Sequence, residues 1–122
     1  MKTKSISYIA FNDSDGEFCL SREALEWMSE RGWSKAYDLL CEIDSHALTL
    51  EKVIKIDETM IGMTRHTPLL ALCLSELGSL RASGPNSFIR VRETTSSRYF
   101  IKCLGGMETV ITPQDIEWIE IK

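Results

Sequence analysis

The segment Arg65–Gly84 constrains the fold more than any other part of the chain, because it contains a helix with clear signals at both ends. Thr67 is a favourable N-cap residue, since its hydroxyl can accept a hydrogen bond from a free amide of the first helical turn. Pro68 follows at the first helical position, and Gly78 stands just after the last apolar residue, where a left-handed terminating residue is favoured. The sequence therefore predicts a helix over 68–77.

This predicted helix is apolar almost all round, with only Ser75 and Glu76 polar between Pro68 and Gly78. A helix of this kind is either central to the core or partly exposed for a partner. It is too short to cross a bilayer, which takes about twenty residues. Both interpretations, core helix and partner helix, stay open at the level of the sequence.

Composition predicts a single domain over residues 1–122. The chain is 43% hydrophobic and 26% charged, as in ordinary globular proteins, and a chain of this length can bury about two thirds of its unfolded surface. The apolar stretch after Met1 is too short for a secretory signal, and the four cysteines are widely spaced. We therefore expect reduced thiols, no membrane association and a cytoplasmic location.

The order of the predicted elements indicates an α+β fold. Besides the helix over 68–77, Ser21 is a favourable cap for a helix that ends near Arg31, and Ser34 can cap another. Residues rich in β-branched and aromatic side chains predict strands over 6–11, 88–93, 98–104, 107–112 and 117–121. Residues 17–20 are a further short extended piece that can pair with 6–11 as a hairpin. We expect one antiparallel sheet packed on two to three helices.

The sequence contains no motif of a known enzyme class. It has no GxSxG, no P-loop, no GxGxxG and no CxxC pair, and its two histidines, His46 and His66, are twenty residues apart. The acidic residues around Gly16 lack the spacing of an EF-hand calcium loop. We therefore expect no enzyme activity, no cofactor and no metal site.

A basic hairpin is one candidate binding site. If residues 88–93 and 98–104 pair through the loop 94–97, alternation brings cations and an aromatic ring onto one surface. Cations interleaved with aromatic rings suit single-stranded nucleic acid or a nucleotide, although a solvated sheet face has the same composition. The residues of this alternative nucleic-acid-binding set are Arg90, Arg92, Arg98, Phe100 and Lys102.

Several segments resemble a set of small uncharacterised proteins of phages, prophages and large viruses. The resemblance rests on residues 16–25, which resemble a Gly-Gly-Phe opening, and on later short motifs. Those motifs are Arg65-His66, Pro68-Leu69-Leu70, Glu76-Leu77-Gly78, Ala82-Ser83-Gly84 and Gly106-Met107-Glu108-Thr109-Val110. The chain departs from the family at Glu17, at Thr67 in place of Asp, and at Leu104-Gly105 in place of Tyr-Asp. The resemblance implies a phage or prophage protein that acts in a bacterial cell.

An acidic surface is the other candidate binding site. Residues 1–61 hold twelve acidic against seven basic residues, whereas residues 62–122 are nearly balanced. An acidic face can dock on a basic groove of a protein, although a solvated acidic surface looks the same in sequence. The candidate residues are Asp38, Glu42, Asp44, Glu51, Asp57 and Glu58. We expect a non-enzymatic protein that binds a host protein or complex, for example as an inhibitor of antiviral defence.

Overall fold

A computed structural model describes residues 5–16, 18–45, 64–84 and 86–122. Within these residues the chain forms four α-helices and two antiparallel sheets of two strands each, so the α+β class is confirmed. The helices are α1 (Arg22–Glu30), α2 (Ser34–Asp44), α5 (Pro68–Leu77) and α6 (Ser79–Ala82). None of the described helices is long and apolar enough to cross a membrane.

The helix ends show which capping signals operate. Ser21 caps α1 as predicted, since its Oγ accepts a hydrogen bond from the Ala24 amide at 3.1 Å. Helix α5 begins at Pro68 and ends before Gly78, which has a positive φ of 81°. The predicted side-chain cap at Thr67 is wrong, because its hydroxyl accepts instead from the Thr64 amide at 3.1 Å.

The strands pair differently from the predicted order. Strand β1 (Ser7–Asn12) pairs with β2 (Ile89–Thr94), and Ser7 lies opposite Thr94. Strand β3 (Phe100–Leu104) pairs with β4 (Met107–Ile111). The two-residue loop between β3 and β4 is Gly105-Gly106, and both glycines have positive φ, as a tight hairpin turn requires.

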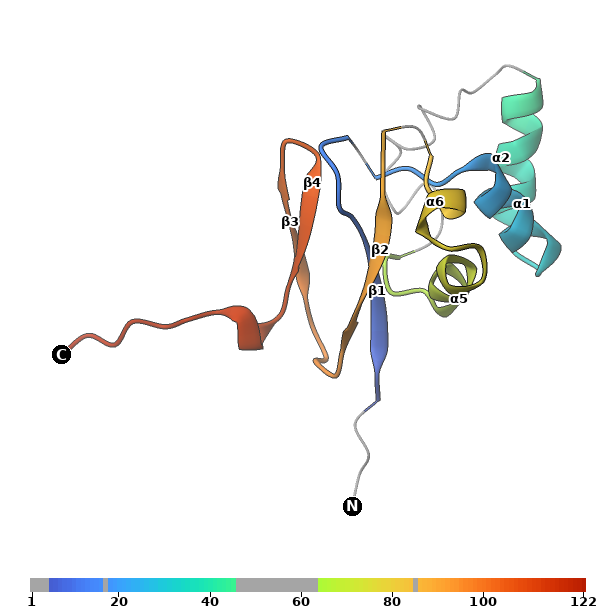
Figure 1. Cartoon of the computed structure of the whole chain (residues 1–122). Helices are drawn as coiled ribbons and strands as arrows, with labels where there is room; N and C mark the ends of the chain where they lie inside the picture. Colours follow the sequence, from blue (N-terminus) through green and yellow to red (C-terminus); the bar gives the residue numbers. More distant parts are fainter. Residues whose placement is uncertain (1–4, 17, 46–63, 85) are drawn as a thin grey trace.

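Sheet β1–β2 lies between the helices and sheet β3–β4 (Figure 1). Alternation along the strands directs Ala10, Ile89 and Val91 toward α5, where they join the main apolar core. Ile9, on the opposite face of β1, is also fully buried, and β4 packs against β1. The rest of the main core comes from the helices and the residues beside them: Leu20, Ala24, Leu25, Met28, Ala36, Leu40, Leu70, Cys73, Leu74 and Ala82.

Three sequence-based expectations about strands are wrong. The hairpin over 88–104 does not form, because β2 pairs with β1 and β3 pairs with β4. Of the segment 17–20, residues 18–20 are described; they do not pair with β1, and Leu20 instead bridges to Ser83. Residues 117–121 form no strand with any described residue. In each case the local pattern favours an extended chain, but a strand also needs a neighbour with free hydrogen-bonding groups.

Candidate functional site

The predicted acidic surface is described only in part. Glu51, Asp57 and Glu58 lie outside the described residues, and Glu42 lies within α2. Asp38 is an exposed residue of the same helix. Asp44 is paired with Arg22 at 2.7 Å, which offsets part of its charge. The described residues therefore provide two exposed carboxylates of the set.

The predicted basic surface is divided between two sheets. Arg90 and Arg92 lie on β2, whereas Phe100 and Lys102 lie on β3. Both arginines of β2 are bound by carboxylates: Arg90 contacts Asp13 at 2.9 Å and Arg92 contacts Asp115 at 2.7 Å. The remaining three residues of the set, Arg98, Phe100 and Lys102, are exposed in or just before β3. The structure thus keeps a smaller basic and aromatic group on one strand.

A buried ionic cluster was not predicted from the sequence. Arg65 donates to both carboxylate oxygens of Glu108, at 2.7 and 2.9 Å, and its guanidinium stacks on the Phe18 ring at 3.7 Å. Glu108 also contacts β1, where its Oε1 accepts a hydrogen bond from the Asn12 amide at 2.8 Å. The cluster therefore joins three separate parts of the chain, namely β1, β4 and the residues before α5.

Asn12 extends this cluster into the neighbouring turns. Its side-chain amide donates to the carbonyls of Gly16 and Gly106, at 2.6 and 3.0 Å, and its Oδ1 accepts from the Phe88 amide at 3.0 Å. A side chain at Gly106 would lie about 2.3 Å from the Gly16 carbonyl oxygen, so glycine is required there. Arg65 and Glu108 both belong to the segments that carry the family resemblance. That resemblance was the only feature of the sequence that singled them out, and their role here is structural.

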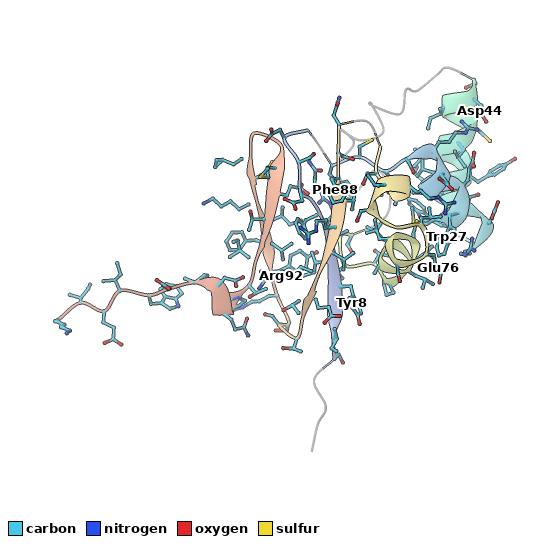
Figure 2. All side chains as sticks on the ribbon, viewed as in Figure 1. Tyr8, Trp27, Asp44, Glu76, Phe88 and Arg92 are labelled. Atoms are coloured by element: carbon cyan, nitrogen blue, oxygen red, sulfur yellow. The ribbon has the colours of Figure 1, made fainter. Side chains whose placement is uncertain are left out.

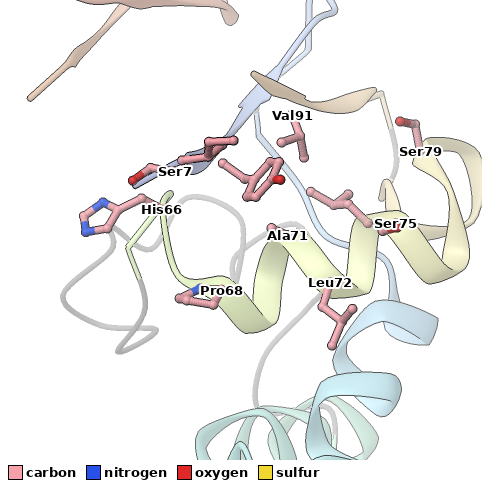
Figure 3. Close-up of a pocket in the computed structure, with 11 residues that line it drawn as sticks. Ser7, His66, Pro68, Ala71, Leu72, Ser75, Ser79 and Val91 are labelled. Atoms are coloured by element: carbon pink, nitrogen blue, oxygen red, sulfur yellow. The ribbon is translucent and has the colours of Figure 1, made fainter. Parts of the chain in front are cut away.

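A groove of about 750 Å³ runs between α5 and sheet β1–β2 (Figure 3). In this view Ser7 and His66 lie toward one end of the groove and Ser79 lies toward the other. His66 also contacts Tyr99, with 2.8 Å between its Nδ1 and the Tyr99 hydroxyl. The described residues of the lining include no acidic residue, lysine or arginine, and they are Ile6, Ser7, Tyr8, His66, Pro68, Ala71, Leu72, Leu74, Ser75, Ser79 and Val91.

The apolar lining of this groove is partly open to solvent. Ile6 is 53% exposed, Tyr8 41% and Leu72 50%, although all three are large and apolar. Leu72 therefore belongs to an exposed side of α5, whereas Leu70, Cys73 and Leu74 form its buried side. The core interpretation is confirmed for the buried side of this helix, and the partner interpretation stays a prediction for its exposed side.

Residues 116–122, which we name the C-terminal arm, extend away from the body of the molecule (Figure 2). They have no regular secondary structure, and their large apolar side chains face solvent. Trp118 is 81% exposed, Ile119 95%, and Ile121 is fully exposed. Exposed apolar groups of this size on a short segment are typical of interaction sites.

The base of the arm is fixed by a short 3₁₀-helix, η1 (Pro113–Asp115). The Asp115 carboxylate accepts from Arg92 at 2.7 and 3.0 Å and from the Thr112 amide at 2.8 Å. These hydrogen bonds, that from Arg92 first, hold the pKa of Asp115 well below its ordinary value. The direction in which the arm leaves the domain is thus set by a charged anchor.

No protein-family model matches the chain, and neither the curated proteins nor the solved structures give a significant match. The resemblance to phage, prophage and viral proteins stays a prediction. The described residues contain no group of three or more His, Cys, Asp or Glu side chains arranged to hold a metal ion.

Proposed function

We propose that this chain is a non-enzymatic protein-binding module that docks on its partner with the C-terminal arm. The observation that carries the proposal is the exposure of Trp118, Ile119 and Ile121 on a segment that extends away from the rest of the described residues. The proposal requires neither a metal ion nor a cofactor.

Burial of these side chains is a sufficient driving force for docking. Each large apolar side chain contributes roughly 1.5–3 kcal/mol when it is removed from water. Ordering the arm offsets part of this gain, since each immobilised side chain costs about 0.5–1.5 kcal/mol. Tryptophan is also enriched among the residues that dominate protein interfaces. An extended arm can add to the edge of a partner's sheet, where its main chain forms further hydrogen bonds.

The proposed partner is a host protein or complex in the cytoplasm of a bacterial cell. This part of the proposal is supported by the resemblance to phage and prophage proteins, and a component of antiviral defence is one such partner. The exposed carboxylates of Asp38 and Asp44 on α2 would favour a partner with a basic surface. Charge of this kind acts mainly on the rate of association.

The test compares two variants of the arm as bait in a bacterial lysate. We expect Trp118→Ala with Ile121→Ala to lose the partner that the wild type captures, whereas Glu117→Ala with Glu120→Ala keeps it. The captured protein is then purified, and its dissociation constant is measured with both variants. Equal affinity of the purified partner for the wild type and the apolar double variant would overturn the proposal.

Nucleic-acid binding through β3 is a second candidate function. Its support is Phe100, which is 55% exposed and lies on the same face of β3 as Lys102. We expect Phe100→Ala with Lys102→Glu to weaken any binding to single-stranded oligonucleotides, with a strong dependence on salt. Binding that is absent in the wild type at low salt would remove this candidate.

A further inference from the structure

The groove beside α5 and the C-terminal arm are both apolar, and neither has a partner within the described chain. The groove exposes Ile6, Tyr8 and Leu72, and the arm exposes Trp118 and its neighbours. Its volume of about 750 Å³ is in the range of pockets that enclose ligands, roughly 300–1,000 Å³. One Trp side chain and a neighbouring Ile can therefore enter it. Each molecule carries one such groove and one arm, so two copies can each supply an arm to the groove of the other.

At the edge of β1 beside the groove, the main chain of Tyr8 has no backbone partner among the described residues. The Ala10 amide donates away from β2, to the Arg65 carbonyl at 2.8 Å. Alternation along an antiparallel strand directs the N–H and C=O of Tyr8 to the same edge. No partner on that edge is recorded for Tyr8 among the described residues. An extended segment can pair there and place alternate side chains in the groove.

The arm of the same molecule starts on the wrong side of the sheet to fill this groove. Its anchor, Asp115, binds Arg92, and Arg92 lies on the face of β2 opposite to Val91. Val91 lines the groove. Figure 1 shows the arm leaving on the side of sheet β3–β4, away from α5. The arm of a second copy is not tied to this starting point and can approach the groove from solvent.

We infer that, in the free protein, the arm of one copy lies along the β1 edge of a second copy, with Trp118 in the groove beside α5. The exchange is reciprocal, so a two-fold dimer contains two identical contacts and twice the buried area of one. Trp118 alone can bury about 150–250 Å² at each contact. This inference rests on the proposed role of the arm as the docking element, and it adds that a host partner must compete with the dimer for that arm.

The test measures self-association by sedimentation equilibrium with matched pairs of variants. We expect the wild type to dimerise, and Trp118→Ala to raise the dimer dissociation constant about 30-fold or more, as for a central interface residue. Glu117→Ala serves as its control, because in an extended, paired arm the Glu117 side chain would point to the face opposite to Trp118. On the receiving side, Leu72→Glu should have a similar effect, whereas Leu80→Glu should have none. Leu80 is an equally apolar exposed residue, on α6 and outside the groove.

Mixing two defective variants tests whether arm and groove meet each other. The arm of the Leu72→Glu copy and the groove of the Trp118→Ala copy are both intact. Their mixture should therefore form a heterodimer with one native contact and associate more strongly than either variant alone, because both substitutions act on the same contact and are not additive. A mixture no stronger than its components would overturn the inference, as would a wild type that is monomeric at every concentration.

The outcomes separate this inference from the proposed function. A monomeric wild type that still binds a purified host partner through the arm would overturn only the dimer. A dimer that needs Trp118, together with a host partner indifferent to the arm, would overturn only the proposed docking role.

Discussion

At the scale of single residues, Arg65 and Glu108 form a buried ion pair between two positions that lie 43 residues apart in the sequence. Both are largely buried, with 15% and 9% of their side chains exposed. The geometry is bidentate, and the remaining capacity of Glu108 is used by the Asn12 amide. A buried pair with this geometry is costly to break, because the surviving side chain stays buried and charged after it has lost this partner.

We expect Glu108→Gln to lower the free energy of unfolding by about 3 kcal/mol, since it leaves the Arg65 guanidinium without its carboxylate. Asp13→Asn, which breaks the exposed pair with Arg90, should cost less than about 1 kcal/mol. Urea unfolding followed by circular dichroism measures both. Similar costs for the two variants would show that the buried pair has no special weight.

Asp115 gives the protein a dependence on acid pH. Hydrogen bonds from Arg92 and Thr112 lower its pKa in the folded state from an ordinary value of 3.8. The stabilisation is therefore complete above the unfolded pKa and is lost as the pH falls through the folded pKa. NMR titration of the Asp115 carboxyl should give a midpoint below 3.8, and Arg92→Gln should raise it. A midpoint at the ordinary value in the wild type would contradict the anchor.

Individual residues were predictable only where the signal is local. Ser21 was identified as a cap because the cap and the amide it serves lie three positions apart. Arg65 and Glu108 are 43 positions apart, and no local pattern marks two such residues as partners. Thr67 shows a competing local contact, since the Thr64 amide takes the hydroxyl that the helix was expected to use.

At the scale of elements, α5 has one buried and one exposed side. The apolar pattern over 68–77 predicted the helix correctly but could not choose between a core and a partner role. Whether a side of α5 is core or exposed depends on which elements pack against it. Among the described residues, sheet β1–β2 and α1 pack against the side that carries Leu70, Cys73 and Leu74.

We expect Leu74→Ala to destabilise the fold by about 2–5 kcal/mol, because Leu74 is buried in the main core. Leu72→Ala should cost much less, since half of that side chain is already exposed. Thermal and urea unfolding of the two variants provide the comparison. Equal losses of stability would mean that the groove is filled by the protein's own chain.

Strand positions were predictable from the sequence, but strand partners were not. Four of the expected strands lie within about two residues of β1, β2, β3 and β4. Their pairing depends on contacts over the length of the chain, and β1 finds its partner some eighty positions away rather than in the next extended segment. For this reason the predicted basic set is divided between two sheets. Arg90 and Arg92 lie on β2, whereas Phe100 and Lys102 lie on β3.

At the scale of the whole molecule, the described chain consists of a folded body and an arm whose large apolar side chains are exposed. The body is joined by the Arg65–Glu108 cluster and by the core between α5 and β1–β2. Asp115, directly before the arm, is bound to Arg92 of the body, and the large side chains of the arm are exposed. Association with a partner and stability of the fold should therefore be separable.

A chain that stops after Asp115 tests this central claim most directly, when its free energy of unfolding and its association are measured on the same sample. We expect its unfolding free energy to equal that of the full chain within about 0.5 kcal/mol, the usual scatter for exposed positions, and its association to be lost. A shortened chain that is clearly less stable, or one that associates as well as the full chain, would contradict it.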